Sequence, residues 1–345
     1  MMRIRLAPSR RPCGFTLVEL MVTLTLGLFI ALGLVQVFAS SNESYDALSQ
    51  ASQQIENGRF AVQTLENDLK HAGYYGEYGF TATAGSALPD PCEKSNLTAV
   101  RDALAFHVQG YDAPGSSPLS CIDDANLVPG TDIIVVRRAS TLTTAPGALV
   151  VNELYMQASA DSTNAANPVL ALGHDSSAFS LLRKDAATPA EIRKFLVRIY
   201  FVSPCSMPAS GTTCTAAADG GRPIPTLKRL ELAVNPASGA LEMQTQSIAE
   251  GIENLQLDYG IDADGDGVPD AASVSAPGSI ADWANVTIAQ VHVLARNIKL
   301  TPGHVDNKTY NLGVAGSVTP GDSFRRHAFT AQVRMVNPAG RREIP

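Results

Sequence analysis

Residues 15–39 read FTLVELMVTLTLGLFIALGLVQVFA, and this stretch decides the fold. Glu19 is its only charged side chain. As an α-helix, an apolar segment of this length reaches across a hydrocarbon core of ~30 Å. The stretch therefore predicts a membrane-spanning helix.

The residues before this stretch are basic. Positions 1–14 read MMRIRLAPSRRPCG and hold four arginines and no acid. Because positive charge stays on the cytoplasmic side, we expect the N-terminus in the cytoplasm and everything after Ser40 on the other side. Three interpretations compete: an uncut anchor, a secretory signal cut after Ala39, and a signal that uses Glu19. The secretory signal fits less well, because its apolar core is usually only ~7–15 residues long.

Glu19 favours the third interpretation. A carboxylate in hydrocarbon costs roughly 2.5–3.5 kcal/mol, so such a residue implies a partner that neutralises it. Residues 14–20, GFTLVEL, resemble the type IV prepilin signal. The resemblance implies cleavage after Gly14 by a prepilin peptidase and N-methylation of the new terminus at Phe15. The chain departs from the family at Cys13, where a basic residue often precedes the glycine.

The apolar pattern continues beyond the membrane segment. Apolar or small residues at 48, 51, 55, 58, 62, 65 and 69 are spaced 3, 4, 3, 4, 3 and 4 apart, which is a helical seam. No proline occurs between Pro12 and Pro89, so one helix over residues 15–72 is predicted. Its front half is membrane-spanning and its back half is amphipathic. We expect the seam to pack on the protein's own head.

Two further segments resemble PilW-type minor pilins of type IV pili. One follows the anchor and includes residues 58–61, GRFA, residues 68–70, DLK, and residues 72–76, AGYYG. The other is residues 251–260, GIENLQLDYG, with residues 291–296, VHVLAR. The first motif often has a cysteine after its last glycine, where this chain has Glu77, so the resemblance gives no disulfide pairing here.

The rest of the chain alternates short β-prone runs with turn-forming clusters. Residues 194–201, KFLVRIYF, alternate polar and apolar side chains, which is typical of antiparallel strands with one wet face. We therefore expect a pilin-like α+β fold: a leader at 1–14, a transmembrane and filament-core helix at 15–39, its amphipathic continuation at 40–76, and a mostly antiparallel β head at 77–345. Strands are predicted at 103–108, 132–137, 148–156, 193–202, 227–234, 241–246, 255–259, 286–294 and 328–336, and loops at 81–91, 157–178, 203–226 and 271–281.

Four cysteines remain once Cys13 leaves with the leader, and they lie on the oxidising side of the membrane. They allow three connectivities, of which the sequential one is the simplest. It pairs Cys92 with Cys121 and Cys205 with Cys214. A zinc site is the alternative, but the sequence has no CxxC and no histidines at ligand spacing. Disulfides are therefore favoured.

The Asp-rich loop, residues 262–270 (DADGDGVPD), is the clearest candidate for a metal site. Asp262, Asp264 and Asp266 fall at positions 1, 3 and 5 of a calcium loop, followed by glycine at position 6. The Val268 carbonyl would supply position 7, and Asp270 stands at position 9. However, position 12 is a serine where an EF-hand has glutamate, and no helix flanks the loop. The loop is either a calcium site or a polar hairpin turn, because Asp-Gly pairs form turns by themselves.

The net charge and the absence of known catalytic motifs exclude some classes of function. With 26 basic and 33 acidic residues the net charge is −7, which is not the basic field of a nucleic-acid binder. The sequence has no GxSxG, GxxxxGK[ST] or HExxH motif, so we expect no enzyme activity. The arginine doublets at 137–138, 325–326 and 341–342 are expected on solvated faces or in contacts at the rim of an interface.

The resemblance implies a minor pilin that helps to start pilus assembly. It would be stored in the inner membrane with a periplasmic head, then join other minor pilins, the major pilin and a tip adhesin at or near the tip of a type IV pilus. Glu19 would accept a hydrogen bond from the Phe15 amine of a neighbouring subunit. The alternatives are a minor pseudopilin of a type II secretion system, which shares the signal and the architecture, and a secreted or membrane-anchored β-rich enzyme.

Overall fold

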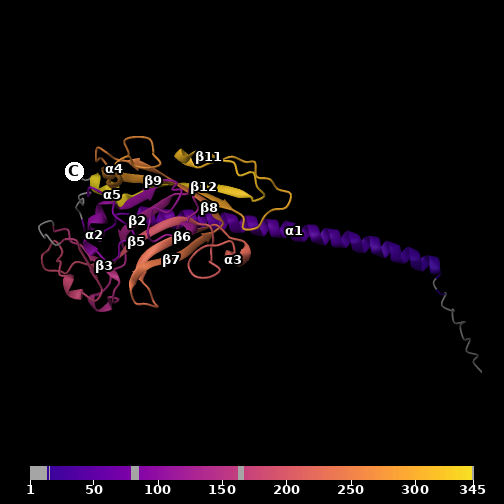
Figure 1. Ribbon diagram of the computed structural model, residues 1–345, viewed down its shortest axis with the longest axis horizontal. Coiled ribbons are helices and arrows are strands. Elements are labelled where there is room, and N and C mark those ends of the chain that lie inside the picture. Colours follow the sequence, from indigo (N-terminus) through magenta and orange to yellow (C-terminus); the bar gives the residue numbers. More distant parts are fainter. Residues whose placement is uncertain (1–13, 15, 79–84, 162–166, 344–345) are drawn as a thin grey trace, which may run out of the picture. The chain divides into compact units, whose positions relative to one another are not determined.

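The computed structural model describes residue 14 and residues 16–78, 85–161 and 167–343. The chain divides into two compact units, Met1–Gln50 and Ala51–Pro345. Helix α1, Leu17–Lys70, contributes to both. The long N-terminal helix and the antiparallel sheets confirm the predicted α+β architecture (Figure 1).

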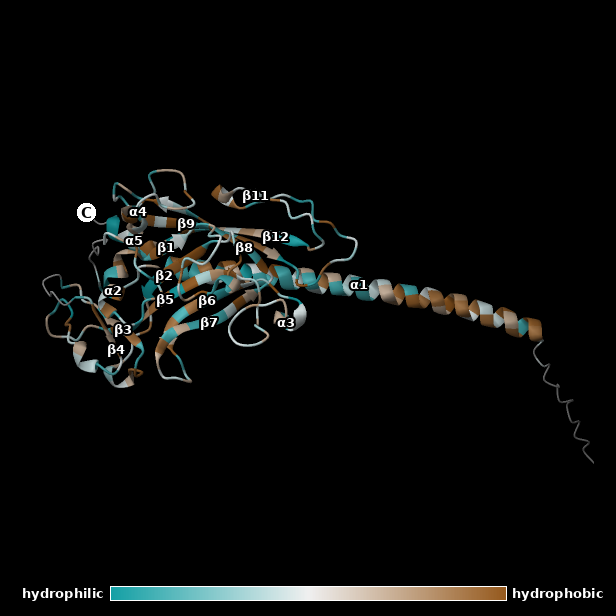
Figure 2. Cartoon of the chain, in the orientation of Figure 1, coloured by the Kyte–Doolittle hydropathy of each residue, from teal (hydrophilic) through white to brown (hydrophobic). Residues whose placement is uncertain are grey.

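The first unit contains the front of α1. Residues 17–39 are almost wholly apolar, and Figure 2 colours this part of the helix mostly brown. Their side chains are exposed, as Phe29 is at 74%. The helix is long and apolar enough to cross a membrane. A helix suits that role because hydrocarbon offers no partner to a free backbone N–H or C=O group.

The second unit is built from two antiparallel sheets and the rear of α1. Within the described residues, the larger sheet has seven strands in the order β1-β2-β5-β3-β4, with β6 beside β5 and β7 beside β6. The smaller sheet has the order β12-β9-β8, and β10 pairs with β11. The strands are β1 Val108–Tyr111, β2 Ile133–Ala139, β3 Leu154–Gln157, β4 Val169–Leu172, β5 Ile192–Ser203, β6 Thr226–Val234, β7 Leu241–Glu250, β8 Ile252–Ile261, β9 Val286–Arg296, β10 Tyr310–Asn311, β11 Ser317–Val318 and β12 Arg326–Arg334. The short helices are α2 Leu97–Asp102, α3 Ala218–Gly221, α4 Ile280–Ala284 and α5 Val336–Arg342, with 3-10 turns at Ala103–Ala105, Asp124–Asn126, Pro146–Ala148, Ser176–Ala178 and Gly313–Ala315.

The centre of the larger sheet, around β2, is buried on both faces. Alternate residues of β2 point to opposite sides, so Ile134 and Val136 join one core while Ile133 and Val135 join the other. The first core also receives the rear of α1 and strands β8 and β9. This two-sided burial explains why β2 starts with four consecutive apolar residues instead of an alternating pattern.

The rear of α1 packs on the sheets through a narrow seam. The predicted seam is right from Gly58 onward but wrong at Leu48, which is 72% exposed, and at Ile55, which is 45% exposed. Gln54 is buried in its place because its side-chain amide donates to the carbonyl oxygens of Ala295 at 2.8 Å and Arg325 at 3.0 Å. The seam consists of Gln54, Gly58, Ala61, Val62, Leu65, Asp68 and Leu69.

Helix α1 ends two residues before the predicted position. Gly73 follows with a φ of +69°, and its N–H donates to the carbonyl of Arg137 at 3.0 Å. A Cβ at this position would lie 3.1 Å from the Cβ of His107. A glycine is therefore needed both to end the helix and to bring the chain close to β2.

Most predicted strands are observed with shifted ends, and some predictions are wrong. Residues 103–105 form a 3-10 turn that continues α2, whose start is capped by Asn96. The predicted strand at 148–156 begins only at Leu154, because a 3-10 turn opens at Pro146. The predicted loop at 157–178 contains β4, which pairs with β3. The second compact unit starts at Ala51, because the rear of α1 forms part of its core.

Candidate functional site

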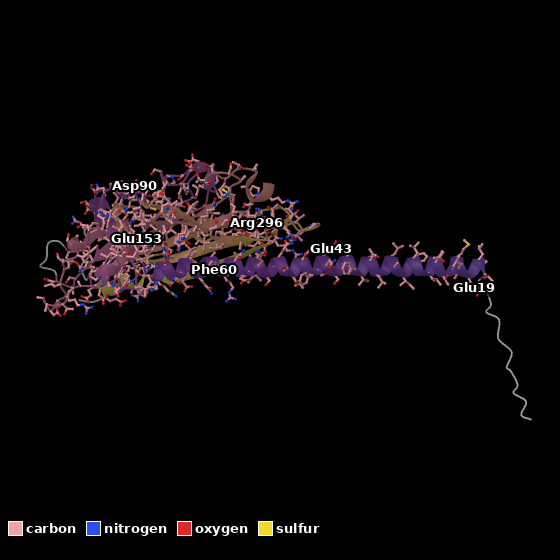
Figure 3. The ribbon with its side chains drawn as sticks, turned by 90° about the horizontal axis from the view of Figure 1, so that it is seen from below. Glu19, Glu43, Phe60, Asp90, Glu153 and Arg296 are labelled. Atoms are coloured by element: carbon pink, nitrogen blue, oxygen red, sulfur yellow. A yellow bond between two sulfur atoms is a disulfide. The ribbon has the colours of Figure 1, made fainter. Side chains whose placement is uncertain are left out.

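The N-terminal motif forms a capping box at the start of α1. The Thr16 N–H and hydroxyl each donate to Glu19 Oε2 at 3.0 Å, and the Glu19 N–H donates to Thr16 Oγ1 at 3.2 Å. These bonds satisfy backbone groups that a helix leaves free at its first turn. They hold the Glu19 carboxylate at the end of the helix, where Figure 3 labels it. Sequence reasoning missed Thr16, although Thr-x-x-Glu before an apolar run is the signature of such a box.

The cleavage site itself is only partly described. Gly14 is exposed, and Phe15 lies outside the described residues. The pairing of Glu19 with a neighbour's Phe15 amine therefore stays a prediction.

A buried ion cluster joins α1 to the larger sheet. Asp68 Oδ1 accepts hydrogen bonds from Arg138 Nε at 3.1 Å and Nη2 at 2.9 Å, and from Arg198 Nη1 at 2.7 Å. The Tyr200 hydroxyl donates to Asp68 Oδ2. Burial alone would raise the pKa of Asp68, but Arg198, Tyr200 and Arg138 together outweigh it and lower the pKa. The cluster fixes the rotation of the rear of α1 on strands β2 and β5.

A second contact brings α1 against the smaller sheet. A Cβ placed on Gly58 would lie 2.1 Å from Cε2 of Phe329 on β12, so only glycine lets that ring reach the helix. One residue earlier, the Asn57 side-chain amide donates to the Glu250 carbonyl at 3.1 Å. Phe60, labelled on α1 in Figure 3, is 52% exposed. The rear of α1 thus has one face committed to the head and a different, partly apolar face left open.

Two disulfides connect the loops of the head, as predicted. Cys92 is bonded to Cys121 and Cys205 to Cys214. Asn126 links the two loops, because its side-chain amide donates to the Thr212 carbonyl at 3.0 Å while its Oδ1 accepts the Cys214 N–H at 2.8 Å. Sequence spacing found the cysteine pairs, but nothing in it pointed to Asn126.

The Asp-rich loop brings three of its predicted residues together. One carboxylate oxygen each from Asp262, Asp264 and Asp270 can lie within 4.8 Å of the others, whereas Asp266 is not part of this group. The Asp266 Oδ1 instead accepts the Val268 N–H at 2.8 Å. The predicted five-residue set is therefore only partly assembled in the described chain.

Asp262 is buried and has partners of its own. It accepts the N–H groups of Gly265 at 2.7 Å and Gly267 at 2.9 Å, and Arg342 of α5 donates to it at 3.1 Å. Burial would raise the pKa of Asp262, but Arg342 and the two backbone donors lower it. Asp264 differs: the Asp266 N–H lowers its pKa, yet desolvation and the neighbouring carboxylates raise it overall. In this loop the negative charge of Asp262 is therefore balanced by Arg342, whereas the negative charge of Asp264 is repelled by the neighbouring carboxylates.

Three arginines of the doublets are buried, contrary to expectation, whereas Arg325 is exposed as expected and Arg341 and Arg342 are half-buried. Arg137 is 1% exposed and Arg138 9%, and Arg326 is 7% exposed. Arg137 donates to the Phe106 carbonyl at 2.9 Å. Arg326 donates to Asp322 and Glu253 and ties the long 297–325 segment to the smaller sheet. Burial of these side chains is tolerated because carboxylate or carbonyl oxygens accept their hydrogen bonds.

Asp258, His292 and Thr330 form a hydrogen-bonded row, and an acid, a histidine and a hydroxyl are also the groups of a catalytic triad. His292 Nε2 lies 3.1 Å from Asp258 Oδ2, and His292 Nδ1 lies 3.2 Å from the Thr330 hydroxyl. The same Asp258 carboxylate accepts the Val314 N–H at 3.2 Å, and a Cβ on Gly313 would lie 2.1 Å from it. Residues 313–315 therefore cover Asp258 and His292, and the hydrogen bond to Asp258 holds these residues on the smaller sheet.

Comparison with protein families gives two matches to this chain. A model described as Type IV Pilus-assembly protein W matches residues 212–337, which run from the second disulfide loop through β12 into α5. A model described as Prokaryotic N-terminal methylation motif matches residues 9–35, across Gly14, Phe15 and Glu19. These two matches support a PilW-type pilin with a prepilin signal. No curated protein and no solved structure matches the chain.

The matched residues 212–337 contain the Asp-rich loop and the His292–Asp258 pair. They cover β6, β7, both strands beside the Asp-rich loop, and Phe329, which contacts Gly58. Pilins of this kind are structural proteins that interact with other components of the pilus. The apolar α1 with its methylation motif fits a membrane-anchored pilin.

Proposed function

We propose that the protein is a minor pilin that helps to initiate a type IV pilus at its tip and has no enzyme activity. Prepilin peptidase removes residues 1–14, and the new terminus at Phe15 is N-methylated. Before assembly the chain crosses the inner membrane once, with its N-terminus cytoplasmic and its head periplasmic. The observation that carries this proposal is the methylation motif placed directly on the start of α1.

The front of α1 supplies the driving force for assembly. Its exposed apolar side chains are stable only in lipid or against other apolar helices. In a helical bundle Glu19 would pair with the Phe15 amine of the adjacent subunit, which removes the cost of an isolated carboxylate in that environment. The Thr16 capping box supports this role, because it already directs the Glu19 carboxylate toward the first residues of the chain.

The rear of α1 is an integral part of the head. The Asp68 cluster and the Gly58–Phe329 contact bind the helix to both sheets. A head held in this way presents its loops in a fixed orientation to other minor pilins, to the major pilin and to a tip adhesin. A type II secretion pseudopilin would share the anchor, but the PilW match over residues 212–337 favours the pilus.

We also propose that the Asp-rich loop binds calcium as a structural ion. Asp262, Asp264 and Asp270 supply the hard carboxylate oxygens that calcium prefers, and they already lie within reach of one another. The Val268 carbonyl and Asp266 would complete the set after a local change. The mutual repulsion that raises the pKa of Asp264 is the feature a cation would relieve.

The proposed function is tested by complementation in cells that lack this gene. Wild-type protein should restore the number of surface pili, and an antibody to the head should label pilus ends and not shafts. Labelling spread evenly along the shafts would contradict a tip role. Unchanged pilus numbers in the deletion strain would contradict the role in initiation.

A further inference from the structure

A cavity of about 450 Å³ opens in the head beside strands β6 and β7. Part of the lining is apolar and is formed by Phe201, Leu230 and Met243. Hydroxyl groups lie beside it, including those of Thr245 and Ser247, which alternate with Met243 on the same face of β7. The cavity therefore combines an apolar wall with polar groups, as binding sites for small organic groups do.

The two disulfide loops form the remaining walls. Cys121 lines the cavity from the first loop, and Thr212 lines it from the second. Asn126 ties these loops together through its hydrogen bonds to Thr212 and Cys214. The shape of the cavity is thus covalently restrained on two sides before any ligand arrives.

Lys228 is the positively charged residue that lines the cavity. It is only 5% exposed and follows a bulge in the β6–β7 pairing at Leu227. In the described part of the chain, no hydrogen bond and no ion pair within 4.0 Å reaches its ammonium group. Burial lowers its pKa, and the attraction of Asp219 acts in the opposite direction. Asp219 is itself occupied, because its carboxylate accepts the N–H groups of Ser206, Met207 and Ile224.

The Lys228 ammonium is open to the cavity and has no hydrogen-bonded partner in the described chain, so it can pair there with an anion. The number of charges favours a monoanion: Lys228 is the cation lining the cavity, and Asp123 at its rim repels multiply charged groups such as phosphate. The apolar wall beside Lys228 accommodates a hydrocarbon group next to the anion. We infer that this cavity binds a carboxylate attached to an apolar group, with Lys228 as its counter-ion.

The carboxylate belongs to a segment of another pilus protein. Among the described strands β7 pairs only with β6, so its second edge is open to an added strand. Such a strand would place alternate side chains on the same face as Met243 and Thr245, which line the cavity. An aspartate, a glutamate or a C-terminal carboxylate on it would then reach Lys228. The inference that the cavity binds a carboxylate depends only on the residues that line it. The inference that this carboxylate belongs to another pilus protein rests on the proposed function.

The first experiment tests the cavity without any pilus. Full-length protein in detergent is acetylated with an amine-reactive ester, and the labelling rate of each lysine is read by mass spectrometry. N-acetyl-leucine is the probe, and N-acetyl-leucinamide is its uncharged control. The carboxylate probe should slow labelling of Lys228 about tenfold once it exceeds its Kd tenfold, while exposed Lys299 is unaffected. Equal labelling of Lys228 with both compounds would overturn the carboxylate site.

The second experiment tests the occupant in isolated pili. A carbodiimide joins an amine to a carboxylate only when the two are in contact. An amide bond between Lys228 and an acidic residue or C-terminus of another chain supports the proposal. Modification that links Lys228 only to this chain's own Asp219, or leaves it free, overturns the protein partner, although the probe result would still establish the cavity. Lys228→Met should lose the cross-link and pilus incorporation, whereas Lys228→Arg and Lys299→Met should retain incorporation, with equal melting temperatures confirming that all three fold.

Discussion

Removing the Asp68 carboxylate should destabilise the head strongly. Its side chain is 2% exposed and accepts bonds from Arg138, Arg198 and Tyr200. In Asp68→Ala, Arg138 would keep only a long bond of 3.4 Å to the Ala139 carbonyl, and Arg198 would keep Glu231 at 2.8 Å. Breaking a buried pair by deleting one partner costs about 3–5 kcal/mol. That is a large part of the ~5–15 kcal/mol that stabilises a typical domain.

The measurement is urea unfolding of the full-length protein in detergent. Trp283 is the chain's single tryptophan and lies 4% exposed in the same core as the α1 seam, so its fluorescence reports on that core. The matched control is Glu66→Ala, which removes an exposed carboxylate two residues earlier on the same helix that pairs with Lys70. The control should change the free energy of unfolding by only ~0.3–0.5 kcal/mol. A loss in Asp68→Ala no larger than that of the control would refute the role of the cluster.

The same cluster predicts a dependence on pH. The pKa of Asp68 is lowered in the folded protein, so its contribution is present above the unfolded value near ~3.9 and is lost as the pH falls through the folded pKa. The stability gap between wild type and Asp68→Ala should therefore be constant from about pH 6 to 8 and should close only below about pH 4. A gap that shrinks between pH 8 and 6 would assign the effect to another group.

Three other predictions concern the signal, the anchor and the loop. Gly14→Leu should block maturation and leave the uncut chain in the membrane, which immunoblots of membrane fractions detect by size. Glu19→Ala should be inserted and cut normally, because removing a charge eases insertion, yet at least ten times less of it should be found in sheared pili; wild-type incorporation would exclude the pairing role. Calcium at a hundredfold excess over its Kd should stabilise the folded full-length chain by about 2.7 kcal/mol relative to chelator. The double variant Asp264→Ala with Asp270→Ala should remove this difference. Identical melting curves of the wild type in calcium and in chelator would show that the loop is a polar turn without calcium.

The sequence alone predicted those features that depend on residues close together in the chain. Residues 15–39 and the prepilin-like signal predicted the anchor, and alternation predicted strands such as β5 and β9. The disulfide pairs followed from cysteine order. The helix seam was right where apolar spacing agreed with packing and wrong at Ile55, because the neighbouring Gln54 finds two carbonyl partners in the head. A local pattern cannot reveal such distant acceptors.

Burial of charge was the main feature that the sequence did not reveal. Arg138 and Arg326 look like surface residues in the sequence, yet Asp68 and Asp322 receive them inside the fold. The Asp-rich loop is a similar case, because Arg342 comes from the far end of the chain to neutralise Asp262. Lys228 shows no sign of its setting in the sequence either, since its cavity is assembled from two disulfide loops and two strands.

The central claim is that this chain is matured as a prepilin, and its N-terminus in the cell tests that claim most directly. The protein is purified from membranes and from pili of the native organism, and its first peptide is sequenced by mass spectrometry. We expect a chain that starts at Phe15 and carries an N-methyl group. A chain that starts at Ser40 would instead identify a secreted protein, and one that starts at Met1 would identify an uncut anchor; either result would contradict the account.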